Sequence, residues 1–165
     1  MKYAIVYSSK TGNTKLLADT IKEYLKTDDC IYCGLPSVTA LAADIIYVGF
    51  WTDKGRANQE ILDFLAGVKD KNLFIFGTCG YGKEASYFDK ILKATTAKVD
   101  SSNRIVGSFV CQGKMPMSIR EKYVEMKKQA FHVPNIDQLI ENFDQALSHP
   151  DLDDLINLQH CLNKH

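Results

Sequence analysis

The sequence has no long apolar run and no excess of charge of either sign. Its apolar stretches stay well below the ~20 residues of a membrane span, and no segment near Met1 resembles the apolar core of a signal peptide. Twenty Lys and Arg side chains balance twenty Asp and Glu side chains, without a basic stripe of the kind that binds nucleic acid. We therefore expect a cytoplasmic protein that binds neither a membrane nor nucleic acid.

Several motifs of catalytic and metal chemistry are also missing. The sequence contains neither G-x-S-x-G nor H-x-x-x-H, so we expect neither acyl transfer nor a metal centre. Five cysteines, an odd number in a chain of ordinary size, favour free thiols over a disulfide framework. Cys30 and Cys33 spell C-x-x-C, but "CIYCGL" is typical of a strand, which places the two thiols on opposite faces.

What the chain does have is an alternation of buried strands and amphipathic helices. Short apolar runs rich in β-branched and aromatic residues predict strands at 3–7, 45–50, 73–77 and 105–111, with a weaker strand at 30–33. Helical spacing of apolar residues predicts helices between the strands and at 119–131, 136–147 and 152–162. This order predicts one α/β domain with a doubly wound, five-stranded parallel sheet.

The junction between the first strand and the first helix is unusually polar. Residues 8 to 14, "SSKTGNT", are rich in hydroxyls and lie where the carboxyl end of a strand would meet a ligand. Gly12 permits close approach of the backbone, and the first N–H groups of the following helix point toward the same place. Helix capping alone needs only one such residue, so we favour an anion-binding loop, although neither a Walker motif nor G-x-G-x-x-G is present.

The stretch "SSKTGNT" after an N-terminal strand resembles the phosphate loop of the flavodoxin family, [ST]-x-T-G-N-T. The resemblance implies a sheet of strand order 2-1-3-4-5 over residues 1–149, followed by a C-terminal helical extension of the same domain at 150–165. It implies FMN as cofactor. The phosphate-loop residues that it assigns to FMN binding are Ser8, Ser9, Lys10, Thr11, Gly12, Asn13 and Thr14.

Two later loops would surround the flavin ring under this resemblance. "GFWTDKG" contains the single tryptophan, Trp51, which we expect to stack on the ring, although a rim position packed on the next helix stays open. "FGTCGYG" contains Tyr81, and the spacing leaves open whether Tyr81 or Tyr87 is the family's outer aromatic residue; we expect Cys79 to be a neutral lining group. The predicted cofactor residues of these loops are Phe50, Trp51, Thr52, Asp53, Lys54, Gly55, Thr78, Cys79, Gly80, Tyr81 and Gly82.

The chain differs from acidic flavodoxins in its charges and at one loop position. Lys54, Arg56 and Lys83 would favour the negative charge of the fully reduced flavin and make its low-potential couple less reducing. Thr52 stands where the family often has Gly, and a β-branched residue resists the peptide flip that stabilises the one-electron-reduced flavin. Asp53 reads mainly as a turn residue, with acceptance of the flavin N3–H as a second hypothesis.

The resemblance implies an electron-transfer protein that passes electrons from a flavodoxin reductase-type donor to a redox enzyme, as a monomer or weak homodimer. "GFWTDKG", "CQGKMP" and the C-terminal extension are similar to a subgroup of short flavodoxin-like proteins, some of which accompany a bilirubin-reducing flavoenzyme. A small FMN-dependent NAD(P)H:quinone-type reductase is an alternative, which we disfavour because no large insertion is evident in the loops. A flavin-free binding module of the same fold is a third possibility.

Overall fold

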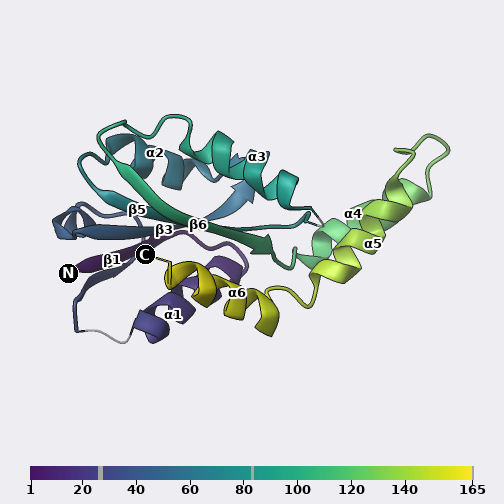
Figure 1. Ribbon diagram of the computed structural model, residues 1–165. Coiled ribbons are helices and arrows are strands. Elements are labelled where there is room, and N and C mark those ends of the chain that lie inside the picture. Colours follow the sequence, from purple (N-terminus) through teal and green to yellow (C-terminus); the bar gives the residue numbers. More distant parts are fainter. Residues whose placement is uncertain (26–27, 83, 165) are drawn as a thin grey trace.

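The computed structural model describes residues 1–25, 28–82 and 84–164, and its centre is a parallel sheet (Figure 1). The strand order β2-β1-β3-β5-β6 confirms the predicted doubly wound topology, because the short β4 only adds an antiparallel hairpin to β3. The strands are β1 Tyr3–Tyr7, β2 Cys30–Gly34, β3 Ile45–Asp53, β4 Arg56–Ala57, β5 Asn72–Cys79 and β6 Arg104–Gln112.

Helices cover both faces of the sheet, which explains why its inner strands are apolar on both sides. Figure 1 shows α1 (Asn13–Leu25) and α6 (Leu152–Leu162) below the sheet, and α2 (Gln59–Gly67) and α3 (Ala85–Thr96) above it. A one-turn helix, η1 (Val38–Ala42), follows β2.

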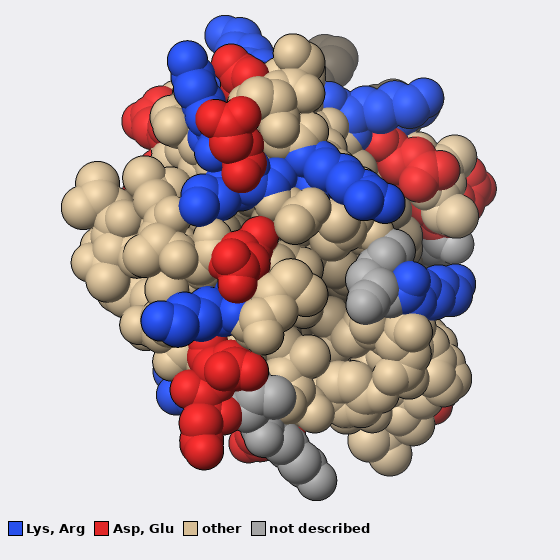
Figure 2. Space-filling view, turned by 60° about the vertical axis from the view of Figure 1, so that its left-hand side comes forward, with Lys and Arg blue, Asp and Glu red and all other residues tan. Residues whose placement is uncertain are grey.

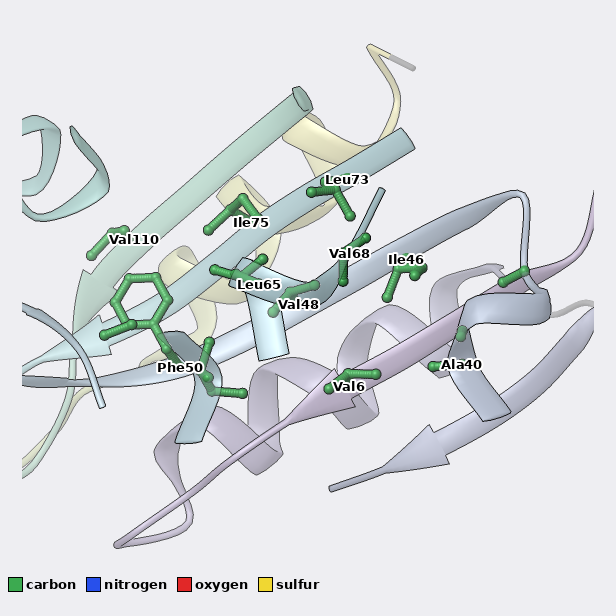
Figure 3. Packing of buried hydrophobic residues seen from close by; sticks show 14 of the residues in the cluster. Val6, Ala40, Ile46, Val48, Phe50, Leu65, Val68, Leu73, Ile75 and Val110 are labelled. Atoms are coloured by element: carbon green, nitrogen blue, oxygen red, sulfur yellow. The ribbon is translucent and has the colours of Figure 1, made fainter. Parts of the chain in front are cut away.

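Alternate residues of each strand enter one of two core clusters. In β1, Tyr3 and Ile5 face α1 and α6, whereas Ala4 and Val6 join the cluster on the opposite face. Figure 3 shows this opposite cluster, in which the fully buried Phe50 packs with residues of β3, β5, β6 and α2. Because both faces are sealed by apolar contacts, the carboxyl end of the sheet is left to carry polar loops.

The C-terminal helix α6 packs on the sheet. It contacts α1 and β6, and its side chains Leu158 and Leu162 are buried in the same cluster as Tyr3 and Ile5. Its start is capped locally, since Asp151 accepts a 2.9 Å hydrogen bond from the Asp154 N–H in a capping box. Residues 152–162 thus complete the core of the domain.

A helical hairpin projects from the carboxyl end of the sheet instead (Figure 1). It consists of α4 (Met117–Lys127) and α5 (Ile136–Ala146), and α4 has no buried residue. Ion pairs join the two helices, with Arg120 donating two hydrogen bonds to Asp144 at 2.7 and 3.1 Å and Lys127 lying 2.5 Å from Asp137. The sequence predicts both helices but not their projection from the sheet, because the projection depends on contacts between them.

Charged side chains of both signs are interspersed on one face of the molecule (Figure 2). Figure 2 shows Lys and Arg side chains alternating with Asp and Glu over the face seen from the side of the termini. Among the described residues, no helix is both long enough and apolar enough to cross a membrane. All five cysteines are free thiols, with Cys30 and Cys33 in β2 as predicted.

Candidate flavin site

The loop after β1 forms a cradle of free hydrogen-bond donors. The Ser8 N–H continues the sheet by donating to the Gly49 carbonyl at 3.1 Å, and α1 begins at Asn13. Between them, within the described chain, the backbone N–H groups of residues 9–12 have no acceptor. Gly12 has a φ of +89°, a conformation that favours glycine. Such a row of N–H groups at a helix N-terminus is suited to an anion.

The loop after β6 is hydrogen-bonded to this cradle, a contact called the clasp below. Its residue Lys114 presents a carbonyl that accepts 2.8 Å and 3.4 Å hydrogen bonds from the side chains of Asn13 and Thr11. A Cβ on the neighbouring Gly113 would lie 2.4 Å from Asn13 Nδ2, so only glycine permits this approach. The sequence pattern did not assign this loop to the site. The carboxyl end of another parallel strand was the signal that could have identified it.

Thr14 and Phe50 form a hydrogen bond that belongs to the scaffold beneath the cradle. The buried Thr14 hydroxyl donates to the Phe50 carbonyl at 3.0 Å and lies 3.3 Å from the Thr78 hydroxyl. The Phe50 ring points away into the core (Figure 3). One hydroxyl therefore ties the start of α1 to the ends of β3 and β5.

The β3–β4 hairpin supplies one aromatic wall. Lys54 and Gly55 form its two-residue turn with φ of +52° and +82°, the signs of a type I′ turn. Thr52 lies in β3, and its hydroxyl donates to the Thr78 carbonyl at 2.8 Å. Trp51 is half-buried, and Lys10 Nζ lies 5.0 Å from the centroid of its ring in a cation–π contact.

The loop after β5 supplies the opposite wall. Tyr81 is 39% exposed, and its carbonyl accepts a 2.6 Å hydrogen bond from the thiol of Cys79. Burial raises the pKa of the Cys79 thiol to about 12, so this thiol is neutral at ordinary pH. A Cβ on Gly82 would meet the Phe88 ring at 2.6 Å, so glycine allows this end of the loop to lie close to α3.

These loops enclose a cavity of about 270 Å³. Of the predicted residues, it brings together Ser9, Lys10, Thr11, Asn13, Thr14, Trp51, Thr52, Lys54, Gly55, Thr78, Cys79, Gly80 and Tyr81. The predicted residues that do not line it are Ser8, Gly12, Phe50, Asp53 and Gly82. Lys83 lies outside the described residues, and Arg56 is not part of the lining.

Further lining residues come from places that the pattern did not assign. They are Gly113, Lys114, Met115 and Pro116 from the loop after β6, Ile119 from α4, and Tyr87, so that both candidate tyrosines face the cavity. Three of the lining residues are lysines, and none of the described lining residues is a carboxylate. The cavity therefore combines positive charge, which favours an anionic ligand, with aromatic walls.

Comparison with known proteins gives a consistent family signal. A family model described as "Flavodoxin domain" matches residues 4–163. The "Flavodoxin-like domain-containing protein BilS" of Clostridium symbiosum is 38% identical, covering 98% of this chain and 94% of the relative. The protein of the same name from Clostridioides difficile is 33% identical, covering 92% of this chain and 88% of the relative.

A solved structure supports the fold. The solution structure of two-electron reduced Megasphaera elsdenii flavodoxin is similar with a TM-score of 0.53 and 19% identity. The similarity covers 87% of this chain and 99% of that one.

Proposed function

This chain belongs to the flavodoxin family, and on that premise we propose that it is an FMN-binding electron-transfer protein that passes electrons between a reductase and a redox enzyme. One observation carries the proposal: a single cavity joins a cradle of free N–H donors to the aromatic residues Trp51 and Tyr81. A phosphate on a ribityl chain and a flat ring system would need these two environments side by side.

The residues of the cavity fit FMN chemically. The N–H groups of residues 9–11 and the Ser9 hydroxyl would hold the phosphate, and the Thr11 hydroxyl would join them by giving up its 3.4 Å bond to the Lys114 carbonyl. Trp51 would cover one face of the ring. Bound FMN would supply the one- and two-electron chemistry. Lys10, Lys54 and Lys114 add positive charge around the cavity, which stabilises added negative charge. We therefore propose that the low-potential couple is less reducing than in acidic flavodoxins.

The α4–α5 hairpin supports a second candidate function. It places Ile119 in the cavity wall and brings Tyr123 to Tyr81, so the site has a wall that the sheet alone would not supply. Small-molecule substrates bind in such enclosed, mostly apolar clefts. This geometry favours an NAD(P)H-dependent quinone-type reductase as the alternative.

The first experiment compares FMN with riboflavin. We expect purified protein to bind FMN with quenched flavin fluorescence, and to bind riboflavin at least about tenfold more weakly, because riboflavin lacks the phosphate worth about 1.4 kcal/mol or more. Trp51→Leu is expected to weaken both ligands, whereas a Ser9→Ala/Thr11→Val double variant weakens FMN alone. A protein that retains no flavin after excess FMN has been removed by desalting would reject the proposal and favour a flavin-free module.

A second experiment separates carrier from reductase. NADH or NADPH is mixed anaerobically with the FMN-loaded protein, and the flavin absorbance is followed with and without a flavodoxin reductase-type donor. A carrier bleaches only when the donor is present, whereas rapid bleaching by the nicotinamide alone supports the reductase. A tetrapyrrole-reducing flavoenzyme is one acceptor to test, because the sequence resembles the short subgroup that accompanies such an enzyme.

A further inference from the structure

The loop that follows β5 separates two cavities at Tyr81. On one side lies the candidate flavin cavity, and on the other lies a larger cavity of about 480 Å³ between this loop and α5. Tyr81 lines both cavities. Because the Tyr81 side chain borders a cavity on each side, contacts from other parts of the chain help to determine its position.

A buried amide network holds the backbone of this loop. The Gly80 carbonyl accepts hydrogen bonds of 3.0 Å from Gln112 Nε2 and 3.0 Å from Asn142 Nδ2. Gln112 also donates to Asn142 Oδ1 at 3.1 Å, and the two side chains are only 6% and 8% exposed. Buried hydrogen bonds of this kind fix a unique geometry, since leaving one partner unpaired is costly.

A second link holds the Tyr81 side chain. Its hydroxyl lies 2.9 Å from the hydroxyl of Tyr123, which belongs to α4, whereas Asn142 belongs to α5. Both helices of the projecting hairpin thus reach the same loop, one at the backbone and one at the side chain. The ion pair of Arg120 with Asp144 joins the helices near these two contacts.

We propose that Tyr123 and Asn142 are positioning residues, through which the α4–α5 hairpin fixes the Tyr81 wall against the bound flavin ring. The hydrogen bonds of Tyr123 and Asn142 to this loop are called the brace below. The inference rests on the proposed function for its effect on flavin, whereas the brace is a property of the protein alone. Breaking it loosens Gly80 and Tyr81 and changes the environment of the ring, although neither Tyr123 nor Asn142 lines the flavin cavity.

The test is a double-mutant cycle with Tyr81→Phe and Tyr123→Phe. Each change deletes one hydroxyl of the same pair and keeps both rings. We expect each single variant to weaken FMN binding by about two- to tenfold, the value of one net hydrogen bond, and to shift the visible spectrum and reduction potentials of the bound flavin. The double variant should be no worse than the singles, because the same bond is already lost. Asn142→Leu should produce the larger loosening, since the removed amide makes two hydrogen bonds, one of them buried and the other partly buried.

The matched control is Tyr32→Phe, which removes a hydroxyl that donates to the Leu35 carbonyl at 2.6 Å on edge strand β2. It should leave flavin binding, the spectrum and the potentials unchanged. Additive effects of Tyr81→Phe and Tyr123→Phe, or a Tyr123→Phe protein identical to the control, would overturn the proposal.

Amide hydrogen exchange of the protein without flavin separates this proposal from the proposed function. We expect faster exchange of the Gly113 N–H, which donates at 2.9 Å to the carbonyl of Cys79 beside Gly80, in Tyr123→Phe and Asn142→Leu, but not in Tyr32→Phe. If exchange rises in this way while even the unmodified protein fails to bind FMN, the proposed function falls and the brace stands. Unchanged exchange in both hairpin variants overturns the brace, whatever the flavin results.

Discussion

Gly113→Ala tests the clasp between the loops after β1 and β6. An added Cβ would meet Asn13 at 2.4 Å from Nδ2, 2.8 Å from Cγ and 3.1 Å from Cβ, which forces the Asn13 side chain to move. The movement breaks its 2.8 Å bond to the Lys114 carbonyl. The lost bond costs about 1 kcal/mol, and residual overpacking adds at least about 1 kcal/mol.

The matched control is Gly67→Ala at the end of α2, where an added Cβ meets nothing within 4 Å. Both substitutions stabilise by about 0.4–1 kcal/mol through the unfolded chain, so only the native-state terms differ. Gly67→Ala should therefore raise Tm slightly, whereas Gly113→Ala should lower the free energy of unfolding by about 1–2 kcal/mol and Tm by about 2–8 °C.

A double-mutant cycle measured by thermal and urea unfolding completes this test. On an Asn13→Ala background the two nearest atoms, Nδ2 and Cγ, are gone and only the Cβ at 3.1 Å is left, so adding Gly113→Ala should cost much less than it does in the unmodified chain. FMN affinity should fall in Gly113→Ala, because Thr11 and Asn13 belong to the proposed phosphate cradle. The reasoning is refuted if Gly113→Ala is as stable as Gly67→Ala, or if its cost is the same with and without Asn13.

Three further changes probe the buried groups and the α6 cap. Since burial raises the pKa of Cys79 to about 12, its thiol should resist alkylation at pH 8 until the chain unfolds. The free energy of unfolding should also fall as the pH rises from 9 to 12, because only the unfolded thiol ionises there. A Cys79→Ala variant whose free energy of unfolding falls equally steeply over this pH range would contradict this. The backbone N–H of Asp154 lowers the pKa of Asp151, so the Asp151 carboxylate stabilises the fold above about pH 4 and ceases to do so as the pH falls through its lower pKa in the folded chain. Asp151→Ala should therefore be less stable than the unmodified chain at pH 7, and the difference in free energy of unfolding should narrow toward pH 2. A difference that does not change with pH would argue against this role. Thr14→Val should lower the free energy of unfolding by about 1 kcal/mol or more, because its hydroxyl bonds the β3 backbone, and Thr20→Val, which loses only a bond to its own helix, should lower it less in the same urea titration.

The sequence predicted the sheet because each strand carries its own evidence. In β1, the alternation of Tyr3 and Ile5 with Ala4 and Val6 is visible in the letters, and the structure sends the two sets to opposite cores. The start of α6 was predictable for the same reason, since Asp151 caps it through a residue three positions away. Local periodicity and local hydrogen bonds are encoded within a few neighbouring residues.

The composition of the cavity depended on contacts between distant residues. Thr14 looks like a ligand residue in the sequence, but its hydroxyl is bonded to the Phe50 carbonyl 36 positions away. Lys114 carries no motif, yet its carbonyl joins the loop at Asn13 across 101 positions. The choice between Tyr81 and Tyr87 could not be made from spacing, because both reach the same cavity.

By itself, therefore, the sequence determined the alternating strands and helices and the strand-end position of residues 8 to 14. It also determined that the Walker, G-x-G-x-x-G, G-x-S-x-G and H-x-x-x-H motifs are absent. Only the tertiary structure decided that α6 completes the core, that α4 and α5 project as a hairpin, and that Asn142 and Tyr123 reach the loop of Tyr81. The physical reason is that periodicity and capping are properties of neighbours along the chain. Packing, cavity shape and long-range hydrogen bonds exist only after the parallel strands bring distant loops to one edge of the sheet.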